Sequence, residues 1–260
     1  MCPLSVTIIC VNEADRIGAA LRSVAFAAEI VVVDSGSTDG TVALARQLGA
    51  RVVETDWPGH VVQKNRAWAL ATQPWVLSID ADEALSPALA VALEAALGQA
   101  ADDVGGFEIL RVNHYLGRKV RGGVFGPAWH PRLARRDAAR WAGEDPHDRL
   151  EIRGRIGRLQ GELDHTPYRH GGEHLDTIHR YSQRFVEVSL ARGRRAYWYD
   201  VCLRPLGHLV VAWILRGGLR DGVLGVTLGF LGAAHVALKW GRLYDAQQAA
   251  GPSAAEPISR

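Results

Sequence analysis

Short runs of valine, isoleucine and leucine recur through the first hundred residues, and each is followed by a segment with helical spacing of apolar residues. The runs predict strands at residues 4–11, 29–34, 51–55 and 75–80. The other segments predict helices at residues 13–25, 40–48, 60–71 and 87–97. The strands lack clean alternation of polar and apolar residues, so helices are expected on both faces of the sheet. The pattern therefore predicts an α/β fold with a doubly wound parallel sheet.

The later part of the chain has a different pattern. Residues 104–170 predict short strands and loops that extend the sheet and complete a cleft, and residues 173–196 predict a polar helix. Two apolar segments follow Pro205, at Leu206–Leu215 and Gly222–Leu238. Each is shorter than the roughly 20 apolar residues that span a bilayer, so a membrane-spanning helix is not expected.

The net charge and the positions of the cysteines argue against several kinds of partner and site. The 260 residues carry a net charge of only +2, which gives no field that would favour nucleic acid as a partner. Cys2, Cys10 and Cys202 are far apart, so neither a disulfide framework nor a thiolate metal site is indicated. The N-terminus enters an apolar strand directly and shows no export signal, which predicts a cytoplasmic protein.

Basic residues gather beside the two apolar segments. Between residues 192 and 242 only Asp200 and Asp221 are acidic. The basic residues of the same stretch are Arg192, Arg194, Arg195, Arg204, Arg216, Arg220, Lys239 and Arg242. This pattern predicts apolar faces that lie in an anionic membrane surface. The alternative is a buried helical pair that packs on the α/β part of the chain.

Two apolar strands run into acidic sequences, Asp34-Ser-Gly-Ser-Thr-Asp39-Gly40 and Asp80-Ala-Asp82-Glu83. Ligands of open parallel sheets bind at the carboxyl ends of the strands, so the two sequences are expected to meet. Asp82, together with Asp80 directly or through water, is predicted to hold Mg²⁺ or Mn²⁺. Asp34 is a candidate acceptor for the N3–H of a uracil, although turn formation and capping also account for its loop. Together the two sequences predict a nucleotide-sugar site.

Four motifs occur in the order and spacing of a known family: Val6–Glu13, Val33–Gly40, Gln63–Asn65 and Asp80–Glu83. On these motifs the chain resembles glycosyltransferase family 2, whose members have the GT-A fold. Within that family it is most similar to lipopolysaccharide-core β-1,4-glucosyltransferases that act on inner-core heptose. The similarity continues to about residue 245 through Pro131–Leu133, Pro146–Asp148, Gly157–Leu159, His165, Arg180–Ser182 and Asp221-Gly222.

The resemblance implies a catalytic domain and an appendage. The fold is expected to be GT-A, a Rossmann-like parallel or mixed sheet with helices on both faces, over residues 1–172. Residues 1–100 are the expected nucleotide-binding half and residues 101–172 the acceptor-side half. Residues 173–248 are expected to be a helical, membrane-associating region, and residues 249–260 a disordered tail.

The resemblance also implies a UDP-sugar donor, a divalent cation and inversion at the anomeric carbon by direct displacement. Asp148 is the expected general base, because Pro146-His147-Asp148 aligns with a His-Glu pair of the family. This chain has Asp where its relatives usually have Glu, which shortens the side chain by one methylene. Glu144 and Asp145 are therefore rival candidates.

The remaining site residues are expected on both sides of the donor. The predicted donor-binding residues are Asp34, Ser35, Gly36, Asp39, Lys64, Asn65, Asp80 and Arg132. His165 is a second candidate metal ligand, with a structural hydrogen bond as the alternative. Arg132 and Arg135 either neutralise phosphates of donor or acceptor or are solvated surface charges.

The residues together with the resemblance imply an inverting, metal-dependent transferase that moves a hexose, glucose by preference, from a UDP-sugar to a lipopolysaccharide core acceptor. It is expected to be peripheral on the cytoplasmic face of the inner membrane, with a lipid-linked glycan acceptor as partner. Alternatives are a polyprenyl-phosphate or other glycan acceptor, and a non-catalytic, membrane-associated sugar-binding scaffold. A phosphatase of the D-x-D-x-T type is excluded, because Glu83-Ala84 follows Asp82 without a threonine.

Overall fold

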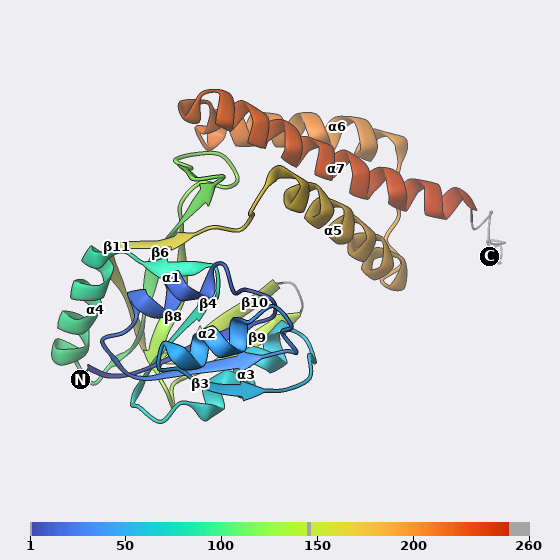
Figure 1. Ribbon diagram of the computed structural model, residues 1–260. Coiled ribbons are helices and arrows are strands. Elements are labelled where there is room, and N and C mark those ends of the chain that lie inside the picture. The colour runs from blue at the N-terminus through green and yellow to red at the C-terminus, as the bar shows by residue number, and fades with distance from the viewer. Residues whose placement is uncertain (1, 145–146, 250–260) are drawn as a thin grey trace, which may run out of the picture. The chain divides into compact units, whose positions relative to one another are not determined.

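A mixed sheet organises most of the first 167 residues (Figure 1). The structure is a computed structural model that describes residues 2–144 and 147–249. The strands of the sheet follow one another in the order β3-β2-β1-β4-β8-β6-β11-β5. Their bounds are β1 (Cys2–Cys10), β2 (Ala27–Asp34), β3 (Arg51–Glu54), β4 (Trp75–Asp80), β5 (Glu83–Leu85), β6 (Val104–Tyr115), β8 (Ala128–Arg135) and β11 (Arg155–His165).

The direction of the strands decides which of their ends share an edge. β1 is parallel to both β2 and β4, and β2 is parallel to β3, as the sequence predicted. β8 is antiparallel to β4 and to β6, and β11 is parallel to β6. The carboxyl ends of β1, β2, β4, β6 and β11 therefore lie along one edge of the sheet. The sheet is mixed rather than wholly parallel, because β8 returns between two parallel strands.

Helices cover both faces of this sheet, as predicted. Leu4, Val6 and Ile8 of β1 share one buried cluster with residues of α1 (Ile17–Ser23), α2 (Thr41–Gln47) and α4 (Pro87–Gln99). Ile9, which points to the opposite face, packs with Ala67 of α3 (His60–Leu70). A hairpin of β9 (Ala139–Glu144) and β10 (His147–Ile152) shares a further cluster with α3. The predicted α/β fold is confirmed.

Several helix and strand boundaries differ from the prediction by a few residues, and the polar helix predicted at 173–196 is observed at Gly171–Ala191. The helix predicted from residue 13 begins only at Ile17. The backbone N–H groups of residues 12–14 are bound by side chains of the loop after β2 and of Thr41, the first residue of α2. The helix predicted at 87–97 begins as expected, since Ser86 Oγ accepts the N–H of Leu89 at 3.3 Å, and it continues to Gln99. Glu83–Leu85 forms β5 and pairs with the end of β11.

The chain divides into two compact units, Met1–His114 with Ala128–Pro167, and Tyr115–Pro127 with Tyr168–Arg260. The segment 115–127, expected within the catalytic domain, thus groups with the helical unit. Asp221 explains this grouping, because its carboxylate accepts the backbone N–H groups of Arg121 and Gly122 at 3.0–3.1 Å. The predicted tail at 249–260 lies outside the described residues, apart from Ala249 at the end of the last helix.

The second unit is built from α5 (Gly171–Ala191), α6 (Trp198–Leu209) and α7 (Val223–Ala249) (Figure 1). It also contains a short strand, β7 (Arg118–Lys119). α6 continues as a π-helical segment, Val210–Leu215, and a 3₁₀ turn at Gly218–Asp221 precedes α7. Trp240 and Leu243 of α7 pack against side chains of α5 and α6 to form the core of this unit.

The prediction that neither apolar segment is long enough to span a membrane is wrong for α7. This helix has 27 residues and, by length and composition alone, is apolar enough to cross a bilayer. The apolar segment in the sequence ends at Leu238, before the charges of Lys239 and Arg242. The helix continues because Lys239 lies over the Phe185 ring and Arg242 donates to Ser182 Oγ at 2.6 Å.

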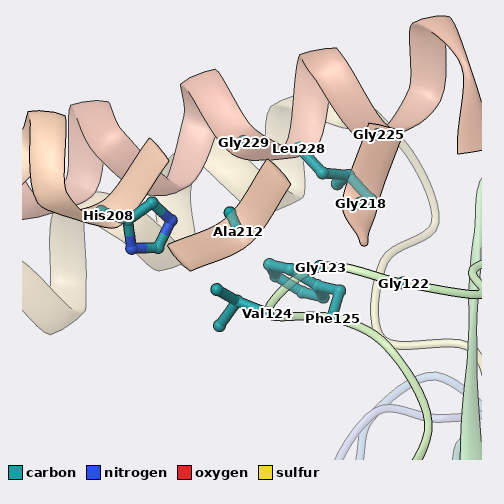
Figure 2. A pocket seen from close by; sticks show the side chains of 10 residues that line it. All are labelled: Gly122, Gly123, Val124, Phe125, His208, Ala212, Gly218, Gly225, Leu228 and Gly229. Atoms are coloured by element: carbon teal, nitrogen blue, oxygen red, sulfur yellow. The ribbon is translucent and has the colours of Figure 1, made fainter. Parts of the chain in front are cut away.

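Glycines allow α7 to approach its neighbours closely. Figure 2 shows a small pocket where the loop Gly122–Phe125, His208 and Ala212 meet α7 at Gly225, Leu228 and Gly229. A Cβ atom on Gly225 would lie 1.8 Å from the carbonyl oxygen of Gly218, and one on Gly229 would lie 2.0 Å from Trp213 Nε1. The Gly225-x-x-x-Gly229 motif therefore serves packing within the chain.

We expect Gly225→Ala to destabilise the protein, because backbone must move to admit the methyl group. Overpacking of this kind costs about 1–3 kcal/mol. The matched control is Gly207→Ala in α6, where a Cβ would meet no atom within 4 Å. It is expected to stabilise the protein slightly, since alanine favours helix. Denaturant unfolding of both variants checks the prediction, and equal stabilities would contradict it.

Candidate active site

The predicted acidic sequences do meet at one edge of the sheet. Asp34 ends β2 and Asp80 ends β4, with β1 between these two strands. His165 ends β11, where it pairs with Asn113 of β6 and Glu83 of β5. The geometry of an open sheet therefore gathers candidate site residues from residues 1–100 and from residues 101–172.

The loop after β2 is shaped by its own acidic residue. Asp34 is fully buried, and its Oδ1 accepts the N–H groups of Gly36 at 2.9 Å and Ser37 at 2.8 Å. Its Oδ2 accepts the Ser37 hydroxyl, and the Cys10 thiol lies 3.5 Å away. Gly36 has φ = 93°, a conformation that glycine adopts without strain. The contact of Asp34 with a uracil stays a prediction. The hydrogen bonds by which Asp34 shapes the loop are present in the structure.

Asp39 and Ser35 connect this loop to its surroundings. Asp39 accepts the backbone N–H groups of Ala14 and Thr41, both at 3.1 Å, and so joins the loop after β1 to the start of α2. Burial opposes its charge, but these hydrogen bonds and one from the Thr41 hydroxyl outweigh burial and lower the pKa of Asp39. The Ser35 hydroxyl accepts from Gln63 Nε2 at 2.9 Å. The loop is thus held in a defined shape.

Asp80 lies between two cations. Lys64 Nζ is 3.1 Å from Asp80 Oδ1 and 2.8 Å from Asp148 Oδ2. Arg132 Nη2 is 3.1 Å from Asp80 Oδ2. Burial would raise the pKa of Asp80, but the charges of Lys64 and Arg132 outweigh burial and hold it far below its usual range. Asp80 is therefore ionised, and Lys64 bridges the end of β4 to the candidate base on β10.

Glu83 contacts Asp80, although no separate role was predicted for it from the sequence. Its side chain is fully buried, Oε2 accepts the Asp80 N–H at 2.9 Å, and Oε1 lies 2.7 Å from Arg132 Nη2. Burial raises the pKa of Glu83 despite the charge of Arg132. The sequence feature that could have indicated this role is an acidic residue at the first position of β5, where its side chain is buried. Its contacts fix the turn that carries Asp80 and Asp82.

Asp82 and His165 form a separate pair at the same edge. His165 Nε2 is 3.2 Å from Asp82 Oδ2, and its Nδ1 is 2.6 Å from Asn113 Oδ1. An oxygen and a nitrogen ligand are thus already together, and a hydrogen bond at the second ring nitrogen orients the imidazole. This donor set fits Mg²⁺ or Mn²⁺ with positions left for other oxygens. Within residues 2–144 and 147–249 no group of three or more His, Cys, Asp and Glu side chains suits a metal ion.

Asn65 and Trp141 position the hairpin that carries Asp148. Asn65 Nδ2 donates to the Trp141 carbonyl at 2.8 Å, and its Oδ1 accepts the Trp141 N–H at 3.0 Å. The ring of Trp141 is buried, and Lys64 Nζ lies 4.3 Å from its centroid. Trp141 was missed in the sequence because a lone tryptophan in an arginine-rich segment carries no motif. Asn65 was predicted to face the donor, and these contacts give it a supporting role.

The two predicted arginines have different environments. Arg132 is 4% exposed, and within the described part of the chain its Nε and Nη1 atoms have no hydrogen-bond acceptor. Arg135 instead donates to the carbonyls of Val104 and Ala101 at 2.9 and 3.2 Å, so it braces the sheet outside the site. The interpretation of Arg135 as a phosphate ligand is therefore not supported by its contacts.

Of the three candidate bases, Asp148 is the one whose side chain is among the described residues. Asp145 lies outside the described residues, and only the backbone of Glu144 is described, at the end of β9. Asp148 lies in β10 opposite Gly143, with its side chain 15% exposed. It is therefore the candidate base whose side chain and partner, Lys64, are both defined.

We expect Arg132→Leu to destabilise the fold strongly, because it removes the nearer of two cations from the buried carboxylate of Glu83 and leaves only Arg111, whose Nη1 is 3.7 Å from Oε1. Removal of one partner from a buried pair costs about 3–5 kcal/mol. The measurement is the free energy of unfolding in denaturant. Arg155→Ala, which opens an exposed pair with Asp103, should stay near wild type. Adding Glu83→Gln to Arg132→Leu should restore part of the loss, and an unchanged midpoint in Arg132→Leu would contradict the prediction.

Comparison with known proteins gives three findings. The family model described as glycosyl transferase family 2 matches residues 5–149. The chain is 30% identical over 250 residues to the lipopolysaccharide core biosynthesis glycosyltransferase LpsC of Rhizobium meliloti, with 94% of this chain and 92% of that protein covered. It is also 52% identical over 87 residues to an uncharacterized glycosyltransferase of Rickettsia felis, with 33% of this chain and 31% of that protein covered.

Among solved structures, one similar chain is glucosyl-3-phosphoglycerate synthase from Mycobacterium tuberculosis, in complex with Mn²⁺, uridine diphosphate and glucosyl-3-phosphoglycerate. The sequences are 24% identical, the TM-score is 0.38, and the match covers 52% of this chain and 57% of that chain. The chain thus spans little more than half of that structure.

Proposed function

The chain belongs to glycosyltransferase family 2, and from this membership we propose that it is an inverting, metal-dependent transferase of a hexose. The proposed donor is a UDP-sugar, UDP-glucose by preference, and the proposed acceptor is a lipopolysaccharide core glycan. Similarity to LpsC along almost the whole length of both proteins supports the choice of acceptor.

The observation that carries the proposal is the contact of Lys64 with both Asp80 and Asp148, beside the Asp82–His165 pair. An inverting transfer needs a base for the acceptor hydroxyl and a stabilised diphosphate leaving group. Asp148 supplies the base, and the Asp82–His165 pair supplies a site for a cation. Lys64 holds the base in register with the turn that carries Asp82.

On the donor side, Asp82 and His165 would hold Mg²⁺ or Mn²⁺. When bound, the cation neutralises negative charge that develops on the diphosphate. The loop Asp34–Gly40 receives the nucleotide, with Ser35, Gly36 and Asp39 in its preformed turn. Lys64 and Arg132 add positive charge on the donor side. The buried Nε and Nη1 atoms of Arg132 have no acceptor among the described residues, so a buried water would satisfy them.

On the acceptor side, Asp148 takes the proton of the attacking hydroxyl while the oxygen of that hydroxyl bonds to the anomeric carbon. The bond from that carbon to the diphosphate oxygen breaks on the opposite face, so the configuration inverts. Asn65 and Trp141 keep the hairpin of Asp148 in place. A lipid-linked acceptor would bring the enzyme to the cytoplasmic face of the inner membrane as a peripheral protein.

Calorimetric binding of UDP-glucose, UDP-galactose and GDP-mannose, with and without Mn²⁺, tests the donor. The proposal expects metal-dependent binding of one UDP-sugar and none of GDP-mannose. Binding of GDP-mannose alone would overturn the uridine assignment. Absence of binding by every donor would favour the scaffold alternative, and transfer to a polyprenyl phosphate but not to core glycan would replace the acceptor.

A further inference from the structure

An exposed apolar stripe runs along α6 and its π-helical continuation. Tyr199, Leu203, Leu206, Val210 and Ile214 repeat at intervals of three or four residues, which places them on one face of the helix. All are exposed, and Ile214 reaches 68%. A face of this kind on a soluble helix would normally be buried against a partner. No described residue of this unit covers the stripe.

The stripe ends in a turn where exposed apolar and basic residues alternate. Leu215 is 73% exposed and Val223 is 79% exposed, and Arg216 and Arg220 between them are also exposed. Asp221 is the acidic residue of this turn, and its carboxylate is already occupied by backbone N–H groups of the loop 121–122. The turn thus presents apolar side chains and positive charge together.

Aromatic residues mark the other end of the stripe. Tyr197, Trp198 and Tyr199 begin α6 and are all exposed, with Trp198 at 67%. The rings of Tyr197 and Tyr199 stack with centroids 5.3 Å apart. Tyrosine and tryptophan favour the level of lipid headgroups, because their rings are apolar and their polar tips bind water.

Charge is divided between the two units. Residues 115–127 and 168–249 carry 14 Lys and Arg against six Asp and Glu. Residues 1–114 and 128–167 carry 15 against 21. The near-neutral chain therefore combines an acidic unit, which holds the candidate active site, with a basic unit that bears the stripe. The partner of the stripe is expected to be both apolar and negatively charged.

We propose that α6 and the turn 214–223 form an interfacial anchor that lies in the plane of an anionic lipid bilayer. The apolar stripe enters the boundary between headgroups and acyl chains, and Arg216 and Arg220 contact the lipid phosphates. This proposal rests on the proposed function, because the anchor would bring the enzyme to the membrane that carries its lipid-linked acceptor. Binding to lipid itself needs neither donor nor transfer.

α7 is a packing partner of the anchor and does not cross the bilayer. Its residues Leu224 and Leu228 are buried with Tyr115 and Val120, and Trp240 is buried with the core of its unit. Lys239 near its middle has its pKa lowered by burial and by neighbouring arginines. A spanning α7 would lose these contacts, whereas an in-plane α6 uses side chains that are already exposed.

Flotation of the full chain with vesicles tests the anchor. We expect the protein to bind vesicles of mixed phosphatidylcholine and phosphatidylglycerol and to bind phosphatidylcholine vesicles only weakly. We expect 1 M salt to release the bound protein. The double variant Arg216→Glu with Arg220→Glu should lower the partition coefficient about 30-fold or more, since each basic residue contributes about fivefold at an anionic surface. The double variant Ile214→Ser with Leu215→Ser should lower it about tenfold.

Matched controls lie on exposed positions of α5. Arg180→Glu with Arg184→Glu, and Leu175→Ser with Leu190→Ser, change charge or apolarity equally in the same unit. These controls should bind like wild type. The proposal would be overturned if the controls lost as much binding as the anchor variants. It would also be overturned if the anchor variants bound vesicles as well as the wild type.

Two outcomes separate the anchor from its alternatives. Protein that stays with the membrane after alkaline carbonate extraction would show that α7 spans the bilayer, and this would overturn the in-plane anchor. Absence of binding to any vesicle would do the same, even if transfer to a soluble core oligosaccharide proceeds. Transfer to that soluble acceptor should be equal in wild type and anchor variants, which separates failure of the anchor from failure of the proposed function.

Discussion

Asp82→Ala is expected to lower kcat/KM for sugar transfer by about 10³-fold, because the cation loses its carboxylate ligand. A bound cation stabilises a developing negative charge by several kcal/mol, and each 1.4 kcal/mol is about tenfold in rate. Asp82 lies 3.2 Å from His165 Nε2 and 3.9 Å from Arg16 Nη1, whereas Asp80 is held at 3.1 Å by both Lys64 and Arg132, so Asp82 is the more available carboxylate for a cation. The measurement is steady-state kinetics over a range of Mn²⁺ concentrations.

The matched control is Asp103→Ala, which removes an exposed carboxylate just before β6, at the opposite edge of the sheet. Its kcat/KM should equal that of wild type at every Mn²⁺ concentration. His165→Ala should weaken the apparent affinity for Mn²⁺ in the same direction as Asp82→Ala. If Asp82→Ala keeps wild-type turnover, the assignment of the cation to the Asp82–His165 pair is wrong.

Asp148→Asn is expected to lower kcat by about 10²–10⁴-fold, the range that a positioned general base contributes. The substitution keeps the shape of the side chain but removes its ability to accept a proton at neutral pH. Binding of the UDP-sugar should be little changed, because the base acts on the acceptor. Steady-state kinetics with calorimetry of donor binding separates the two effects.

Three further variants decide between Asp148 and its rivals. Asp148→Glu should keep much of the activity, since it restores the carboxylate that related enzymes usually carry. Glu144→Gln and Asp145→Asn should each stay within a few-fold of wild type. A loss of about 10²-fold or more in either rival, with Asp148→Asn active, would move the base to that residue.

Most of the fold of the first hundred residues could be predicted because its signals are local. Runs of valine and isoleucine mark strands whose two faces are covered, and Asp34 and Asp80 stand at their carboxyl ends. The topology of a parallel sheet then brings those ends together without any knowledge of long-range packing. The predicted meeting of the two acidic sequences at one edge followed from this rule.

The supporting residues of the site could not be predicted because their partners are distant in sequence. Asn65 is held by the backbone of Trp141, and Glu83 by Arg132, and neither spacing is a motif. Likewise, charges at Lys239 and Arg242 hid the length of α7, because their stabilising contacts come from α5. Sequence pattern located the charges but not the neighbours that accommodate them.

The most direct test of the account is the configuration of the product that forms from UDP-glucose and a truncated lipopolysaccharide core oligosaccharide. Proton NMR of the purified product reports whether the new glycosidic bond is α or β. We predict a β-linked hexose, formed when Mn²⁺ is present and lost in Asp82→Ala. An α-linked product would contradict inversion by direct displacement, and failure to transfer any UDP-hexose to the core would contradict the proposed function itself.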